Sequence, residues 1–312
     1  MGIMIGVVAT LVTILFNLFV NPVLQGAFGP IGVAFTEIGF ALIALATAVI
    51  YIVWKRRDLD RRHIEYGESD YTVESVFSFK LPKFGHIVGG MMLMFAGYLL
   101  STMYYNIVIR LCPEAYTTLT DSISNTYSGT FLATFCTIAV VPPVCEELLL
   151  RGAIQKTFSD LPKPIHTILL SGLMFGLFHI DPIRIPFATM MGIILSYAYY
   201  RSGSILVPIL MHFANNAYSF VTSWQFKDES IAALLEQTTA AATGSFAEIF
   251  SGILAAAAFA FIALFAALAG VSFFEPNLIE SVQKHRHVFT AVIITIFALG
   301  IGMAVSILVF GY

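Results

Sequence analysis

Charged residues are scarce in this sequence. Asp, Glu, Lys and Arg together make up 11% of the 312 residues, hydrophobic residues make up 58%, and the mean hydropathy is +0.85. Soluble globular domains contain about 25% charged residues, so the composition excludes an ordinary soluble domain. It predicts an integral membrane protein that crosses the lipid bilayer several times.

Cysteine is scarce too. The three cysteines, Cys112, Cys136 and Cys145, show no C-x-x-C spacing, which excludes a disulfide framework and a thiolate zinc site as sequence-based hypotheses. The H-E-x-x-H motif of many zinc proteases is also absent. The basic run near Lys55 lacks an aromatic stacking pattern, so nucleic acid is not a predicted partner.

Long apolar runs, by contrast, are frequent. A membrane-spanning helix needs about 20 residues, and seven runs have about that length, whereas two more are shorter. The fold class is therefore predicted to be an all-α polytopic membrane protein with about eight to nine transmembrane helices around a central catalytic bundle. The long runs are 3–24, 31–54, 86–109, 128–150, 205–223, 248–272 and 289–310, and the short ones are 165–180 and 187–200.

Lys and Arg predict the orientation, because they concentrate in cytoplasmic loops. Seven of them lie between Lys55 and Gly85, so this loop is predicted to be cytoplasmic. Alternating the spans from there places all but three of the sixteen cations on the cytoplasmic side, the exceptions being Arg110, Arg184 and Lys227. The N-terminus is then inside and the C-terminus outside.

The chain is predicted to form one membrane domain, 1–312, with three parts. No inverted repeat relates its halves, which disfavours a transporter that uses buried glutamates as a proton relay. The three parts are 1–110 with the basic loop, 128–223 as a central core and 244–312 as closing helices, and polar linkers at about 111–127 and 224–243 are predicted to be extracytoplasmic.

Ionised groups interrupt the central part at the stretch EELLLR, which begins at Glu146. An ionised side chain at mid-bilayer costs about 2.5–3.5 kcal/mol, so these residues are expected to face a polar cavity. Glu147 and Arg151 stand four apart and can form an ion pair, which leaves Glu146 for chemistry. Pro142 and Pro143 remove backbone donors and predict a kink there. The alternative interpretation places Arg151 at the cytoplasmic helix end, among the headgroups.

Two further motifs supply histidines. FGLFH places Phe175 and His179 one helical turn apart, and HFANN does the same for His212 and Asn216. Each pair alone is typical of ordinary interhelical contacts. Beside the glutamates, however, these groups offer a general base for water and donors for an oxyanion. Because no serine or cysteine nucleophile accompanies the histidines, hydrolysis by an activated water is the predicted reaction class.

A metal is compatible with the same residues. Glu146, His179 and His212 are the residue types of a common catalytic zinc site. Two mechanisms therefore stay open: the attacking water is bound to zinc, or it is held by Glu146 and His179 alone.

The three motifs, in this order, resemble the CPBP family of intramembrane proteases, which includes the type II CAAX prenyl endopeptidases and the bacterial ABI proteins. That family carries E-E-x-x-x-R, F-x-x-x-H and H-x-x-x-N on successive membrane helices. The matching stretches here are EELLLR, FGLFH and HFANN, and they fall within residues 128–223.

The resemblance implies a role for each motif residue, in a cavity open to the cytoplasm. Glu146 and His179 would activate water, and His212 and Asn216 would form the oxyanion site. The residues expected to support this geometry are Glu147, Arg151 and Phe175.

The predicted function is therefore that of an intramembrane endopeptidase that cuts a peptide near a membrane anchor. Its partner would be a membrane-anchored substrate, either a prenylated C-terminus or a small membrane peptide. The alternative hypothesis is a non-catalytic membrane scaffold or immunity-type protein of the same fold that binds a partner peptide.

Overall fold

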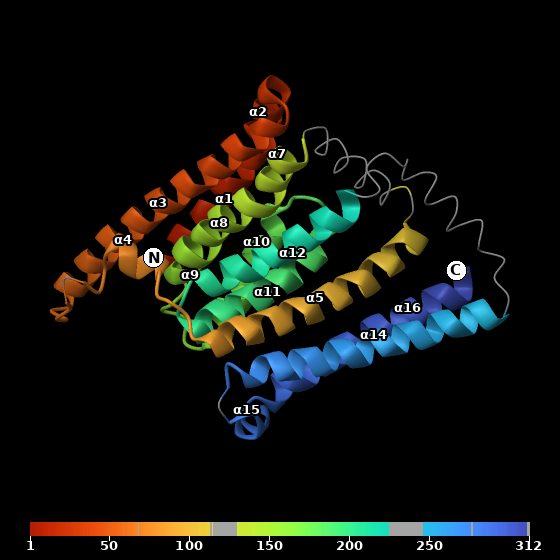
Figure 1. Ribbon diagram of the computed structural model, residues 1–312. Coiled ribbons are helices and arrows are strands. Elements are labelled where there is room, and N and C mark those ends of the chain that lie inside the picture. The colour runs from red at the N-terminus through yellow and green to blue at the C-terminus, as the bar shows by residue number, and fades with distance from the viewer. Residues whose placement is uncertain (68, 113, 115–129, 225–245, 276, 311–312) are drawn as a thin grey trace. The chain divides into compact units, whose positions relative to one another are not determined.

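A computed structural model describes the chain apart from residues 68, 113, 115–129, 225–245, 276 and 311–312 (Figure 1). Every regular element among the described residues is a helix, which confirms the all-α prediction. The two predicted extracytoplasmic linkers, about 111–127 and 224–243, lie almost entirely outside the described residues.

Six helical segments are long and apolar enough to cross a membrane. Their existence agrees with a polytopic membrane protein, whereas the total of eight to nine crossings stays a prediction. The six segments are Gly2–Phe28, Ile31–Arg61, Phe84–Leu111, Phe131–Thr157, Phe250–Ser272 and Arg286–Val309.

The helices group into two compact units. Unit 1 comprises Met1–Ile87 and Ser128–Phe220, and unit 2 comprises Val88–Tyr127 and Val221–Tyr312. The boundary falls inside α5 (Phe84–Leu111) and α12 (Leu206–Trp224). The other elements of unit 1 are α1 (Gly2–Phe19), α2 (Asn21–Phe28), α3 (Pro30–Arg61), α4 (Val73–Phe77), α7 (Phe131–Phe135), η2 (Cys136–Val140), α8 (Val141–Glu147), η3 (Leu148–Ile154), α9 (Gln155–Thr157), α10 (Pro164–Phe178) and α11 (Arg184–Ser202), and those of unit 2 are α14 (Phe246–Ser272), α15 (Leu278–Lys284) and α16 (Arg286–Phe310).

The segment from α7 to α9 is one helix that changes its winding twice. It passes through the π-helical stretches η2 and η3, and η2 directly precedes the two prolines of α8. Proline has no backbone N–H, which disrupts the regular hydrogen-bond ladder at this point. The helix nevertheless continues to Thr157, beyond the predicted end at residue 150.

This extension corrects the expected position of Arg151. The guanidinium does not reach the headgroups from a helix end, because Arg151 lies inside the helix and is 0% exposed. The alternative interpretation of Arg151 is therefore wrong.

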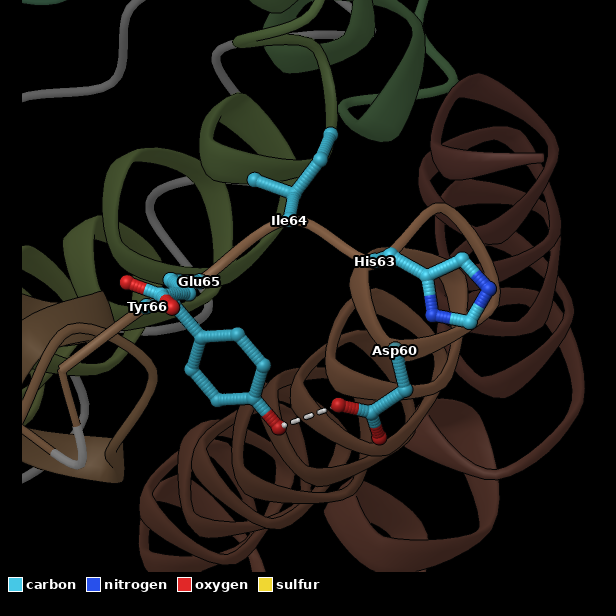
Figure 2. Close-up of a pocket in the computed structure, with 5 residues that line it drawn as sticks. All are labelled: Asp60, His63, Ile64, Glu65 and Tyr66. Carbon is cyan, nitrogen blue, oxygen red and sulfur yellow. Dashed lines mark hydrogen bonds between the residues drawn. The ribbon is translucent and has the colours of Figure 1, made fainter.

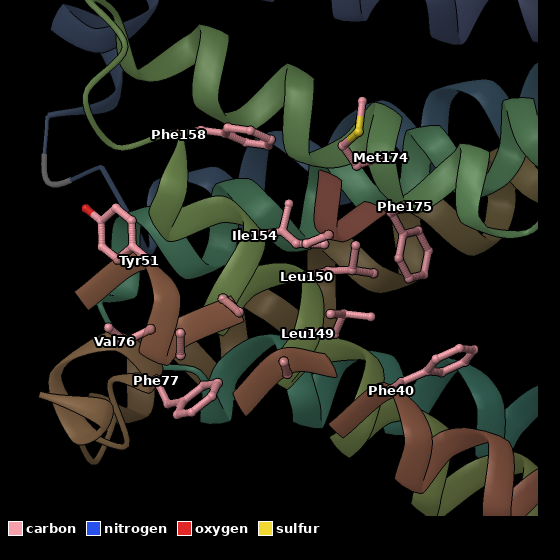
Figure 3. Close-up of a cluster of buried hydrophobic side chains, with 14 of the residues drawn as sticks. Phe40, Tyr51, Val76, Phe77, Leu149, Leu150, Ile154, Phe158, Met174 and Phe175 are labelled. Atoms are coloured by element: carbon pink, nitrogen blue, oxygen red, sulfur yellow. The ribbon is translucent and has the colours of Figure 1, made fainter. Parts of the chain in front are cut away.

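A buried apolar cluster holds the broken helix in unit 1. Leu149, Leu150 and Ile154 from η3 pack with Phe40 and Tyr51 of α3, and Figure 3 shows them together with side chains of α4 and α10. In lipid, van der Waals packing rather than a hydrophobic force holds such side chains together. The cluster therefore fixes the rotation of the helix that carries the EELLLR motif.

The loops that the charge pattern assigns to the cytoplasm meet at one end of unit 1. Lys55 forms an ion pair of 2.8 Å with Asp160, the Ser204 hydroxyl donates to the Lys80 carbonyl, and Ile205 N–H donates to the Ser78 carbonyl. The prediction that these loops share one side is confirmed for the unit, whereas the identity of that side stays a prediction.

Helices α10 and α11 approach each other closely, as the G-x-x-x-G pair in α10 predicts. A Cβ atom on Gly172 would lie 2.7 Å from the Ile193 nitrogen, and one on Gly176 would lie 2.9 Å from the Ile185 carbonyl. Only glycine fits at such distances. The close approach fixes the end of α10, where His179 follows.

Unit 2 packs through small residues. Ala256, Ala260 and Ala263 of α14 are buried, and a Cβ atom on Gly300 of α16 would lie 2.9 Å from the Ala260 Cβ. Small side chains let helix backbones approach in lipid, where no hydrophobic force drives association.

Candidate active site

The centre of the site is a fully buried ion pair. Arg151 Nη1 donates to Glu147 Oε1 at 2.8 Å, and both side chains are 0% exposed. Arg151 Nη2 donates to the Gly192 carbonyl of α11 at 3.1 Å. The predicted pairing within EELLLR is thus present, and it joins the broken helix to α11.

His212 attaches to the same carboxylate. Its Nδ1 lies 2.8 Å from Glu147 Oε1. Because the carboxylate paired with Arg151 is an acceptor, Nδ1 carries the hydrogen. The other ring nitrogen, Nε2, therefore faces the rest of the site, and it lies 3.9 Å from Glu146 Oε2.

Glu146 is the carboxylate that is left over. Its residue is 7% exposed, and its Oε2 atom has no hydrogen-bond partner among the described residues. Buried polar atoms are nearly always hydrogen-bonded, so an unpaired carboxylate oxygen beside a histidine indicates a functional group. Glu147 Oε2 also lacks a hydrogen-bond partner in the described part of the chain, but Glu147 is held by Arg151 and His212 through Oε1. The division of labour between the two glutamates stays a prediction.

The end of α10 determines which nitrogen of His179 is free. His179 N–H donates to the Gly176 carbonyl rather than to that of Phe175, so the Phe175 carbonyl lacks its usual helical donor. The His179 ring supplies the hydrogen bond instead, with Nδ1 at 2.8 Å. A carbonyl oxygen only accepts, so Nδ1 is protonated, and Nε2 of the neutral ring is left with its lone pair.

Phe175 contacts three of the charged or titratable side chains. Its ring centroid lies 4.9 Å from that of His179 and 5.6 Å from that of His212, and the Arg151 guanidinium stacks 4.6 Å from it. The ring thus separates the two histidines and packs on the buried cation, as its expected supporting role requires.

Asn216 binds the main chain. Its Nδ2 donates to the Ile138 carbonyl in η2 at 3.1 Å, and its Oδ1 accepts a hydrogen bond from Asn215 Nδ2 at 3.2 Å. One of its two amide hydrogens is therefore used within the protein, and one is left for a ligand.

Glu37 is a buried carboxylate that the sequence analysis left outside the site. It lies on α3, is 6% exposed, and interacts electrostatically with Glu146. Its Oε2 atom lacks a hydrogen-bond partner within the described part of the chain. A carboxylate inside a predicted membrane span is the signal that could have identified it.

The three candidate zinc ligands do not converge. Among the described residues, no group of three His, Cys, Asp or Glu side chains is arranged to hold a metal ion. His212 and Glu146 approach each other, and Nδ1 of both histidines is bound within the protein, which leaves Nε2 as the nitrogen that could bind a metal. The three side chains are nevertheless not arranged as a three-ligand zinc site, and zinc stays a prediction.

A surface pocket lies elsewhere in unit 1, at the end of α3. Figure 2 shows its lining, in which the Tyr66 hydroxyl donates to Asp60 at 3.1 Å. None of the predicted site residues lines it; the lining residues are Asp60, His63, Ile64, Glu65 and Tyr66.

Comparison with known proteins identifies the central part of the chain. Residues 128–218 match the family model described as type II CAAX prenyl endopeptidase Rce1-like. No curated protein and no solved structure matches the chain. The match includes all three motifs and confirms the resemblance to CAAX proteases for this part of the sequence.

Proposed function

We propose, from the membership of residues 128–218 in the type II CAAX prenyl endopeptidase family, that this integral membrane protein is an intramembrane endopeptidase. The observation that supports the proposal most is the unpaired, buried Glu146 carboxylate beside His212. Its neighbour Glu147 binds both Arg151 and His212 through Oε1 and serves as the structural anchor.

Water activation is assigned to Glu146 and His179. Glu146 removes a proton from water, and the resulting hydroxide attacks the carbonyl carbon of the scissile peptide bond. His179 orients this water through Nε2, because Nδ1 is held by the Phe175 carbonyl. The proton that Glu146 takes up then passes to the leaving amine, so the carboxylate is restored. General base catalysis of this kind contributes roughly 10²–10⁴-fold.

The oxyanion of the tetrahedral intermediate is assigned to His212 and Asn216. His212 Nδ1 already donates to Glu147, so its Nε2 can donate only when the ring carries both hydrogens. Asn216 contributes the amide hydrogen that does not bind Ile138.

The proposed substrate is a peptide bond close to a membrane anchor. The family match favours a prenylated C-terminus, and a small membrane peptide is the second candidate. Because the site residues lie within or next to apolar helices, an anchored peptide reaches them without leaving the bilayer.

The test is cleavage of prenylated and plain membrane-anchored peptides by the purified protein in detergent or lipid. Glu146→Gln should lower kcat by at least about 10²-fold, and Glu74→Gln, at an exposed glutamate of α4, should leave it unchanged. A chelator with zinc add-back decides the metal question independently. If the wild type cuts no peptide, the scaffold hypothesis gains support, and binding of the same peptides is then measured.

A further inference from the structure

The two prolines of α8 remove two backbone donors, and the Ile138 carbonyl is an acceptor that loses its donor in either helical winding. The Ile138 carbonyl would accept from residue 142 in an α-helix and from residue 143 in a π-helix. Both positions are proline, which has no N–H. The remaining neighbour, Val141, donates its N–H to the Cys136 carbonyl instead.

Asn216 of α12 supplies the missing donor. Its Nδ2 lies 3.1 Å from the Ile138 oxygen. Asn215 Nδ2 donates to Asn216 Oδ1, so the amide is oriented with its nitrogen toward Ile138. An unsatisfied main-chain carbonyl in lipid costs several kcal/mol, and this contact removes that cost at the site of the break.

The same helix also holds the other side of the break. His212, one turn before Asn216, binds Glu147 at 2.8 Å, whereas Asn216 binds Ile138. The prolines lie between these two attachment points. Helix α12 therefore fixes the broken helix both before and after the break.

We propose that Asn216 is a positioning residue: by binding the Ile138 carbonyl it closes the gap made by Pro142 and Pro143 and thereby fixes the direction of α8, which carries Glu146. This role is separate from the oxyanion contact, which uses the other amide hydrogen. The activity arm of the test rests on the proposed function, whereas the unfolding arm does not.

The test restores the backbone donor that the prolines remove. Asn216→Leu, close in shape but without an N–H, is combined with Pro142→Ala and with Pro143→Ala, and thermal unfolding midpoints are measured. In the wild-type background Asn216→Leu should lower the midpoint by at least about 2–4 °C. With an N–H restored at the position that reaches the Ile138 carbonyl, residue 142 in α-helical winding or residue 143 in π-helical winding, the same change should lower it by less than half as much.

Two matched controls define the outcome. Pro164→Ala, at the first residue of α10, restores an N–H that has no carbonyl to bind, so it should not reduce the effect of Asn216→Leu. Asn106→Leu removes an amide that bonds within its own helix, and its effect should be equal in all backgrounds. Equal losses for Asn216→Leu in every background overturn the proposal.

A second measurement applies if the proline variants do not fold. In Asn216→Leu alone, amide hydrogen exchange of residues 144–148 should accelerate at least about tenfold, which corresponds to 1.4 kcal/mol, and unchanged exchange overturns the proposal.

For activity, restoring the N–H should recover part of the loss in kcat caused by Asn216→Leu, with KM unchanged. If the protein cleaves peptides but the proline changes do not reduce the effect of Asn216→Leu on the unfolding midpoint, only the positioning role is rejected. If the proline changes reduce that effect but no peptide is cleaved, only the proposed function is rejected.

Discussion

The two units differ in what their helices bury. Unit 1 buries the ionisable side chains of Glu37, Glu146, Glu147, Arg151 and His212, whereas the buried polar side chains described in unit 2 are Ser101 and Ser306. Each of those serines bonds a carbonyl of its own helix. Apolar packing is thus sufficient for a membrane helix bundle, and the costly buried charges are concentrated where the family motifs lie.

The units also differ in helix regularity. Two π-helical stretches interrupt the helix that carries Glu146, whereas the described helices α14 and α16 of unit 2 are continuous over 27 and 25 residues. Irregular winding frees main-chain carbonyls, and side chains such as Asn216 then bind them. In unit 1, therefore, a break in a helix occurs together with a polar side chain that binds the carbonyl it leaves free.

The largest effect on stability is expected from breaking the buried ion pair. Arg151→Met leaves the Glu147 charge buried with His212 as its remaining partner, and removing one member of such a pair costs about 3–5 kcal/mol. The unfolding midpoint of the purified protein measures this loss. The double variant with Glu147→Leu should recover part of it, and a double variant as unstable as Arg151→Met would contradict this prediction.

Overpacking a tight helix contact should lower the stability by a smaller amount in both units, but it should lower peptide cleavage only in unit 1. A Cβ atom on Gly172 in unit 1 meets the Ile193 nitrogen at 2.7 Å, and one on Gly89 in unit 2 meets the Gly270 carbonyl at 2.8 Å. Changing either glycine to alanine should cost about 1–3 kcal/mol through overpacking. Only Gly172→Ala should also reduce peptide cleavage, because α10 positions His179; equal losses of cleavage would contradict the comparison.

Glu37 should show opposite effects on stability and activity. Replacing this buried, unpaired carboxylate with leucine removes an unsatisfied polar group, so Glu37→Leu should raise stability by about 1 kcal/mol. Cleavage should fall, because the charge that interacts with Glu146 is lost. Unfolding midpoints and kcat are measured together, with Glu37→Gln as the isosteric control. A stabilised variant with full activity would show that Glu37 has no part in the site.

The smallest effect on stability is expected from removing the ion pair between Lys55 and Asp160 at the end of unit 1. Lys55 and Asp160 form an ion pair at 2.8 Å, in which the Asp160 side chain is 49% exposed and the Lys55 side chain 13% exposed. Because solvent reaches the Asp160 carboxylate and screens the pair, its contribution should lie near the value of about 0–1 kcal/mol for exposed pairs. Lys55→Ala should therefore shift the unfolding midpoint little, and high salt should reduce the shift. A loss as large as that of Arg151→Met would show that this exposed contact also anchors the fold.

The sequence predicted the relations that lie within one helix. The pairing of Glu147 with Arg151 follows from their spacing of four residues, and it is present at 2.8 Å. The G-x-x-x-G spacing of Gly172 and Gly176 likewise indicates that some helix approaches closely there, but not which one. The order of the three motifs was sufficient to suggest the family that residues 128–218 match.

Only the tertiary structure decided which helices meet. The sequence placed His212 and Asn216 one turn apart but did not reveal that they bind Glu147 and the Ile138 carbonyl. It also did not reveal that Arg151 lies inside a continuing helix or that the buried Glu37 interacts electrostatically with Glu146. Helix geometry fixes the spacing of neighbours along one helix, whereas contacts between helices depend on how the whole bundle packs, and no local pattern encodes that packing.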